Sequence, residues 1–152
     1  MFSRINKAMT DRRNGIKSDE GFTLIELLVV VIIIGILAAI AIPIYIGVQN
    51  NAKDSAVKSD ISNAKTAVVA YETSNNGSLP TDLTGLSTDG YTVPAAGDSN
   101  YGTTGSAPAI TFNGTSGFCI QATSVTSNTF AASDTTGVEA GTCTAGVFTA
   151  AG

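Results

Sequence analysis

The sequence predicts an α+β protein in which one long N-terminal helix packs on a small C-terminal antiparallel sheet. Three observations lead to this fold class. Residues 27–48 form an apolar run without a charge, residues 49–73 carry apolar side chains at helical spacing, and residues 74–152 alternate short apolar runs with Gly, Ser, Asn and Asp. These patterns are typical of a membrane-length helix, an amphipathic helix, and short strands joined by turns.

The N-terminal segment, residues 1–21, is polar and basic. It holds five of the eight basic residues, and the chain after Gly21 holds three lysines against nine acids. The part after Gly21 is therefore acidic. An acidic surface repels phosphate backbones, so we expect no specific nucleic-acid partner.

The apolar run from Leu27 to Val48 decides the class of the protein, and its only polar side-chain atom is the Tyr45 hydroxyl. As a helix it would extend roughly 33 Å at about 1.5 Å per residue, enough to cross a bilayer core of about 30 Å. A helix satisfies its own backbone in lipid, whereas a lone strand does not. Pro43 should kink this helix without ending it, because apolar residues continue beyond it. The basic residues ahead of the run place the N-terminus in the cytoplasm and the C-terminal part outside.

Residues 49–73 predict an amphipathic continuation of the same helix. Asp54 and Lys58 can pair on its polar face, since they lie four residues apart. No strong helix breaker occurs between Gly47 and Ser74, so we expect one helix from about Leu24 to Thr73, ended by the Asn-Asn-Gly sequence at 75–77. Its apolar stripe repeats at intervals of three and four residues and consists of Val57, Ile61, Ala64, Val68 and Tyr71.

The last part of the chain predicts short strands. Thr, Val, Ile and Phe recur between turn residues, and residues 84–108 resemble a loop. A small antiparallel sheet placed against the helix stripe would bury both apolar faces. The expected strands are Ala109–Phe112, Gly117–Thr126, Asn128–Ala132 and Gly146–Ala150.

Residues 21–26 read Gly-Phe-Thr-Leu-Ile-Glu and lead directly into the apolar run. From Gly21 to about Tyr45, this combination resembles the processing and methylation site of type IV pilins and of the related pseudopilins of type II secretion systems. The resemblance implies the pilin fold. It divides the chain into a cleaved cytoplasmic leader (1–21), a transmembrane and filament-core helix (22–48), the amphipathic second half of that helix (49–73), and an extracellular domain with a disulfide loop (74–152).

The resemblance also assigns roles to three residues of this motif. A membrane prepilin peptidase would cut between Gly21 and Phe22, Phe22 would be N-methylated, and Glu26 would pair with the Phe22 amine of a neighbouring subunit. The residues themselves agree, because an acid inside a membrane segment is a functional candidate by default. The alternative is a capping box, in which Thr23 and Glu26 satisfy the helix N-terminus. Both roles can coexist, one before assembly and one after it.

Four further residues match features of the family. Gly35 and Pro43 correspond to positions between which the helix can unwind in filaments, although Gly35 could simply allow close packing and Pro43 could be a plain kink. Cys119 and Cys143 would form the C-terminal disulfide loop, worth about 3 kcal/mol by loop-closure arithmetic. Two unpaired thiols are the alternative.

The resemblance implies a structural function as a major pilin-like subunit of a type IV pilus. The subunit would leave the cytoplasmic membrane through a platform protein and an assembly ATPase, and would join a helical homo-oligomer at the cell surface that serves adhesion or twitching motility. The alternatives are a pseudopilin of a type II secretion or DNA-uptake apparatus, a tethered or secreted binding module, and an exported protein whose ordinary signal is cut before Ile42.

Composition argues against an enzyme. The chain has no His, so a Ser-His-Asp triad, a Cys-His pair and an imidazole metal site are excluded. We expect no catalytic residues, no cofactor and no metal. The acids of the turn-rich region match no defined calcium loop and are interpreted as solvated turn residues: Asp82, Asp89, Asp98, Asp134 and Glu139.

Overall fold

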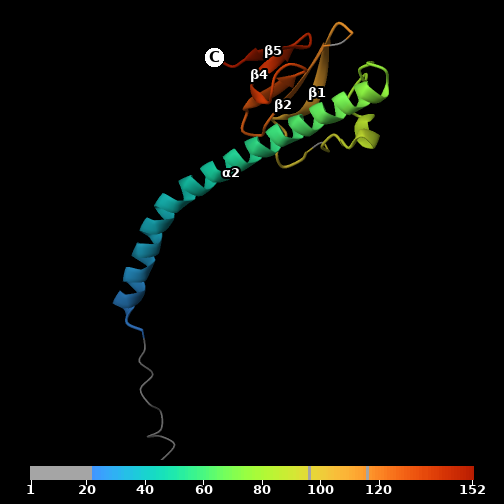
Figure 1. Cartoon of the computed structure of the whole chain (residues 1–152). Helices are drawn as coiled ribbons and strands as arrows, with labels where there is room; N and C mark the ends of the chain where they lie inside the picture. The colour runs from blue at the N-terminus through green and yellow to red at the C-terminus, as the bar shows by residue number, and fades with distance from the viewer. Residues whose placement is uncertain (1–21, 96, 116) are drawn as a thin grey trace, which may run out of the picture. The chain divides into compact units, whose positions relative to one another are not determined.

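The computed structural model describes residues 22–95, 97–115 and 117–152, and the expected leader 1–21, with Gly21, lies outside them. Within the described residues, one long helix and one short 3-10 helix accompany five strands (Figure 1). The α+β prediction is confirmed. The elements are α2 (Leu24–Ser74), η1 (Leu86–Asp89), β1 (Ser106–Asn113), β2 (Gly117–Thr123), β3 (Thr129–Ser133), β4 (Glu139–Thr144) and β5 (Val147–Ala150).

Helix α2 begins at the expected residue and ends one residue later than expected. Two residues beyond its end adopt left-handed backbone conformations, Asn76 with φ of 57° and Gly77 with φ of 83°. The Gly77 N–H donates a 2.9 Å hydrogen bond to the Glu72 carbonyl. Such a bond closes the last helical turn, and Gly and Asn tolerate the left-handed backbone that it requires.

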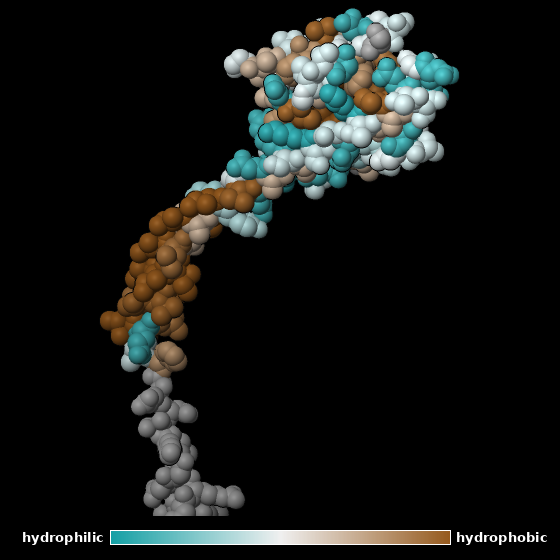
Figure 2. Space-filling view, viewed as in Figure 1, coloured by the Kyte–Doolittle hydropathy of each residue, from teal (hydrophilic) through white to brown (hydrophobic). Residues whose placement is uncertain are grey.

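The chain divides into two compact units between Ile44 and Tyr45, so α2 contributes to both. We call Leu24–Ile44 the apolar half of α2 and Tyr45–Ser74 its packed half. The apolar half is hydrophobic over the face seen in Figure 2, apart from a hydrophilic patch at its N-terminal end. Its large side chains remain 47–88% exposed. No other residue that the structure describes therefore covers this surface.

The packed half supplies one side of a hydrophobic core. Its expected stripe is buried at Val57, Ile61, Ala64 and Val68, with Tyr71 packed at the edge. Phe118, Ile120, Ala122, Phe130 and Ala132 complete the core from β2 and β3, and Leu83, Leu86, Tyr91 and Tyr101 do so from the connecting segment. Burying one large apolar side chain contributes roughly 1.5–3 kcal/mol, so this cluster accounts for the attachment of the helix to the sheet.

The connecting segment, residues 84–108, has little regular structure, as expected. It also contributes to the core, since Leu86, Tyr91 and Tyr101 are each at most 4% exposed. Leu86 lies in η1, and the Tyr91 N–H donates to the Leu86 carbonyl at 3.0 Å. The segment is largely irregular in backbone and nevertheless forms part of the core.

The strands follow one another in the order β1-β2-β3-β4-β5, and each pairs antiparallel with the next. The first three lie within three residues of their predicted ends, and β4 was not predicted. Its sequence, Glu-Ala-Gly-Thr-Cys-Thr, has weak strand propensity. Steric space explains the glycine in this strand, because a Cβ at Gly141 would collide with the Phe148 ring of β5.

The β4–β5 hairpin covers the face of β1 and β2 that points away from the helix. It leaves β3 after the pair Phe130↔Ala140. The Cys143 N–H then donates to the Gln121 side-chain oxygen of β2 at 2.7 Å, and the Gly146 N–H donates to the Thr111 hydroxyl of β1 at 3.2 Å. The sheet is therefore covered by α2 on one face and by its own last hairpin on the other.

Polar ties also join the packed half of α2 to the loops. The Asp54 carboxylate accepts hydrogen bonds from Ser124 (2.6 Å), Thr126 and Asn128 (2.6 Å). Partial burial opposes the charged form, but these three bonds outweigh it, so the pKa of Asp54 lies below its ordinary value. Lys58, the expected partner of Asp54, holds its ammonium 4.6 Å from the Phe130 ring centroid instead.

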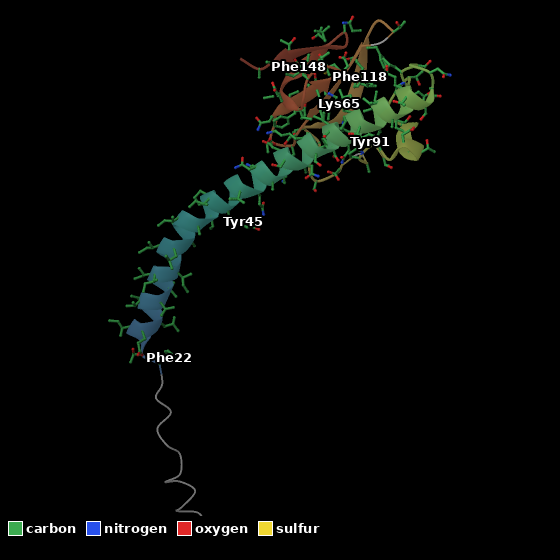
Figure 3. All side chains as sticks on the ribbon, viewed as in Figure 1. Phe22, Tyr45, Lys65, Tyr91, Phe118 and Phe148 are labelled. Carbon is green, nitrogen blue, oxygen red and sulfur yellow. A yellow bond between two sulfur atoms is a disulfide. The ribbon has the colours of Figure 1, made fainter. Side chains whose placement is uncertain are left out.

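Two more ties reach distant segments from the same helix. Tyr101 donates its hydroxyl to the Asp60 carboxylate at 2.7 Å. Burial and this hydrogen bond raise the pKa of Tyr101. The Lys65 ammonium donates to the Thr136 carbonyl at 2.8 Å and so holds the β3–β4 connection (Figure 3).

Candidate functional site

The start of α2 carries a complete capping box. The Thr23 N–H and hydroxyl both donate to one Glu26 carboxylate oxygen, at 2.8 and 2.7 Å. In return the Glu26 N–H approaches the Thr23 hydroxyl oxygen at 3.3 Å. This reciprocal arrangement satisfies free backbone donors at the helix N-terminus, where the helix dipole also favours a negative charge. The alternative interpretation of Glu26 is therefore realised in the uncut chain.

The capping box leaves Glu26 available for a second role. Glu26 lies in the first turn of α2, and Phe22 lies directly ahead of that turn (Figure 3). The Phe22 side chain is 86% exposed. While Phe22 is joined to Gly21 it has an amide and no charge. Cutting that bond would convert the amide nitrogen into an amine. The only carboxylate in the apolar half of α2 would then lie close to a new cation.

The apolar half of α2 is the largest exposed hydrophobic surface among the described residues. By length and composition, α2 is the one helix among the described residues that could cross a membrane, and its apolar half supplies the hydrophobic stretch. Soluble monomers rarely expose a contiguous apolar surface of this extent. A helix that is hydrophobic on all sides is buried in its working state, either in lipid or among other helices.

Gly35 and Pro43 both lie inside the continuous helix. A Cβ built at Gly35 would meet nothing within 4 Å, so no described neighbour requires a glycine there. Glycine inside a helix costs about 0.5–1 kcal/mol relative to alanine. Pro43 lacks an N–H and leaves the carbonyl four residues earlier without its helical bond. Both residues therefore weaken the same stretch of helix, and no packing contact among the described residues explains why they are there.

Cys119 and Cys143 are joined by a disulfide, with their Cα atoms 5.7 Å apart. Cys119 lies in β2 and is fully buried, and Cys143 lies in β4. The bond fastens the outer hairpin to the sheet. The pair belongs to the second unit and has a structural role in this chain.

The structure thus brings Phe22, Thr23 and Glu26 together and places Gly35 and Pro43 in one helix segment. Sequence reasoning missed the bonds from Asp54, Asp60 and Lys65 to distant loops. Charged residues on the polar face of a helix were the available signal, but their partners are separated from them by 41 to 74 residues. Among the described residues no group of three or more His, Cys, Asp or Glu is placed to hold a metal ion.

Comparison with known proteins identifies one family model, described as the prokaryotic N-terminal methylation motif, which matches residues 16–42. The chain is 55% identical over 53 residues to the type IV major pilin protein PilA of Myxococcus xanthus, covering 35% of this chain and 24% of that pilin. It is 47% identical over 53 residues to the type IV major alpha-pilin of Moraxella bovis, covering 35% of this chain and 33% of that pilin.

A third relative belongs to a secretion system. The chain is 39% identical over 70 residues to the type II secretion system core protein G of Klebsiella michiganensis, covering 46% of this chain and 49% of that protein. The chain thus spans between a quarter and a half of the length of these curated relatives. No solved structure matches the chain.

Proposed function

We propose that this chain, which belongs by its N-terminal segment to the type IV pilin and type II secretion pseudopilin family, is a structural subunit of a type IV pilus filament. One observation carries the proposal. A helix half that is apolar on all sides follows directly behind a capped N-terminus, and its large side chains remain 47–88% exposed. A surface of this kind requires a partner outside the chain, and sister helices in a filament core provide it.

Before assembly the apolar half anchors the subunit in the cytoplasmic membrane. The positive-inside rule places residues 1–21 in the cytoplasm and the β domain outside. Transfer into a filament exchanges lipid neighbours for apolar helices, with little net hydrophobic change. Small free-energy terms therefore decide the register in which the helices associate.

The charge pair between Glu26 and a Phe22 amine is such a term. The prepilin peptidase cuts after Gly21, and the new amine of Phe22 is then methylated. The carboxylate of Glu26 gives up its Thr23 partner or shares it, and it pairs with the amine of a neighbouring subunit. Because an unpaired charge is expensive in an apolar core, a subunit inserted in the wrong register loses this pair and is disfavoured.

The proposed partners follow from the same family. A platform protein in the membrane and a cytoplasmic ATPase extract the subunit, since apolar anchors do not leave a bilayer unaided. The finished filament is extracellular and displays the β domains on its surface, where they serve adhesion or twitching motility. The relatives are structural proteins, so the proposal includes no enzymatic activity.

A pseudopilin is the second candidate function. The match to core protein G covers 70 residues, whereas each of the matches to the two pilins covers 53. The Cys119–Cys143 loop favours the pilus, because the family's pilins often carry such a loop. Electron microscopy of surface filaments, with and without the gene, separates the two candidates. Loss of surface filaments supports the pilus, and an unchanged filament population supports the pseudopilin.

Intact mass and N-terminal sequence of the mature protein test the processing step. Methylated Phe22 at the N-terminus is the expected result. A mature chain that begins at Ile42 identifies an ordinary export signal, and retained Met1 identifies a plain membrane anchor. Either of these two results overturns the filament proposal.

Three variants separate the two roles of Glu26. Glu26→Gln keeps the capping box, since Gln also serves at this position, but removes the charge. Thr23→Ala weakens the cap and keeps the charge. Glu26→Ala removes both. We expect all three to insert into the membrane, Thr23→Ala to assemble, and the two Glu26 variants to yield few filaments. Normal filament yield from Glu26→Gln contradicts the charge-pair role.

A further inference from the structure

A cleft of about 500 Å³ opens in the second unit where β4 leaves β3. One wall is α2, another is β3, and the third is the β4–β5 hairpin. The side chains that matter for its chemistry are Asp54, Lys58, Thr129, Phe130, Thr142 and Thr149. The cleft therefore combines two charged groups with a hydroxyl-bearing wall.

The group of this cleft that keeps free hydrogen-bonding capacity for a ligand is the Lys58 ammonium. Asp54 already accepts hydrogen bonds from Ser124, Thr126 and Asn128. Lys58 is exposed, and its ammonium rests over the Phe130 ring at 4.6 Å from the centroid. An exposed cation–π contact is worth about 0.5–1 kcal/mol and uses none of the three ammonium hydrogens. The Lys58 ammonium also helps to lower the pKa of the neighbouring Asp54. Its hydrogens nevertheless remain available, and a carboxylate is the group that fits them.

The opposite end of the packed half carries acids without a nearby base. Glu72 lies in the last turn of α2, and that turn contains no basic residue. The C-terminal end of a helix is the negative end of its dipole, so an acid there is unfavourable in the isolated subunit. Asp89 closes η1, whose Leu86 belongs to the same hydrophobic core as Val68 of α2. After Gly21 the chain has three lysines. Lys65 already binds the Thr136 carbonyl, and Lys58 is the lysine that lines the cleft.

We propose that the Lys58 cleft receives the acidic end of α2 from a second copy of this chain, with Glu72 as the ligand. This inference rests on the proposed filament function and identifies a contact between its outer domains. Lys58 and Glu72 are roughly 21 Å apart along the helix axis, at about 1.5 Å per residue. A copy displaced by that length brings its Glu72 level with the Lys58 of its neighbour.

The proposed contact joins different surfaces of the two copies. Such a head-to-tail interface leaves one free cleft and one free acidic end after each addition, so it propagates as an open helix. The carboxylate gains a cation, and the unfavourable acid at the end of α2 becomes neutralised. A single exposed ion pair contributes little free energy, but this pair is repeated at every subunit of the filament. Two like charges at the same place would repel and so disfavour a wrongly placed subunit.

Charge exchange in the full chain tests this contact. Lys58→Glu and Glu72→Lys each place two like charges at the proposed interface, and we expect each to reduce the yield of sheared filaments about fivefold. The double variant Lys58→Glu with Glu72→Lys restores an opposite pair, and its yield should return toward that of the wild type. Glu139→Lys, at an exposed acid in β4 outside the cleft lining, changes the net charge as Glu72→Lys does and should leave the yield unchanged.

Glu72→Lys is the more informative single variant. It relieves the unfavourable acid at the helix end, so a purely structural role predicts a more stable subunit and an undiminished yield. Cellular amounts of processed subunit serve as the folding control, and Lys58→Gln replaces Lys58→Glu if the latter does not accumulate. If the wild type forms filaments and Glu72→Lys gives full yield, this contact is overturned and the proposed function is not. The same holds if the double variant shows no recovery of yield. Absence of wild-type filaments overturns the proposed function instead.

Discussion

The two halves of α2 share one continuous backbone and have opposite sources of stability. In the packed half, Val57, Ile61, Ala64 and Val68 are completely buried, and the polar face is tied to loops at Asp54, Asp60 and Lys65. In the apolar half, every large side chain is exposed and a glycine and a proline weaken the helix. The packed half finds its partner within the chain, whereas no described residue packs over the apolar half.

Truncation of one isoleucine in each half tests this contrast most strongly. Ile61→Ala should lower the free energy of unfolding by about 2–5 kcal/mol, because it opens a cavity in the core. Ile33→Ala, at a side chain that is 51% exposed, should change it by less than about 0.5 kcal/mol. Denaturant unfolding of the full chain in detergent measures both. Equal losses in the two variants would break the comparison.

The disulfide should matter only to the second unit. Replacing both Cys119 and Cys143 with Ala should cost about 3 kcal/mol of unfolding free energy, since the bond restrains the unfolded chain over the loop that it closes. The helical circular dichroism signal of the full chain in detergent should remain near that of the wild type at low denaturant. Loss of that signal would show that the bond also supports the helix.

The tie at Asp54 should contribute a smaller, pH-dependent amount. Asp54→Asn should cost about 1–2 kcal/mol at neutral pH, because it weakens hydrogen bonds to a charged group that is partly exposed. The folded pKa of Asp54 is lowered, so its contribution is present above the unfolded value of about 3.9 and is lost as the pH falls through the folded value.

Acid titration of stability provides the measurement for this tie. From pH 5 downward the wild type should lose more unfolding free energy than Asp54→Asn does. Glu139→Gln, at an exposed acid in β4, serves as the matched control and should follow the wild type. If the unfolding free energy of all three proteins falls in parallel with pH, the Asp54 hydrogen bonds do not stabilise the packing of the helix.

Two buried tyrosines give the finest test of the packed half. Tyr101 donates to Asp60, whereas the buried Tyr91 hydroxyl has no partner within the described residues. Tyr101→Phe should therefore cost about 1 kcal/mol of unfolding free energy, and Tyr91→Phe should be neutral or slightly stabilising. Thermal unfolding of the two variants decides the point, and a larger loss from Tyr91→Phe contradicts it.

Much of this fold could be predicted because its signals are local. The length of the apolar run, the stripe from Val57 to Tyr71 and the Asn-Gly stop each need only neighbouring residues, and α2 follows its prediction within one residue. The capping box was likewise visible as Thr23 and Glu26 at their required spacing. These features depend on backbone geometry that repeats every turn.

The remaining features depend on partners far along the chain. Strand β4 has weak propensity and exists because Gly141 fits under Phe148 and Cys143 reaches β2. Tyr91 and Tyr101 enter the core from a segment without periodicity, because the helix and sheet leave space there. The Lys58 cleft forms only where the last hairpin turns away from β3. No local pattern specifies such long-range arrangements.

The position of the outer hairpin has a consequence for chemical attack on the disulfide. Cys119 is fully buried, and the β4–β5 hairpin lies over β1 and β2, so a reductant reaches the Cys119 sulfur only when that hairpin opens. The rate at which the folded protein loses its bond through that sulfur therefore reports how often the hairpin opens.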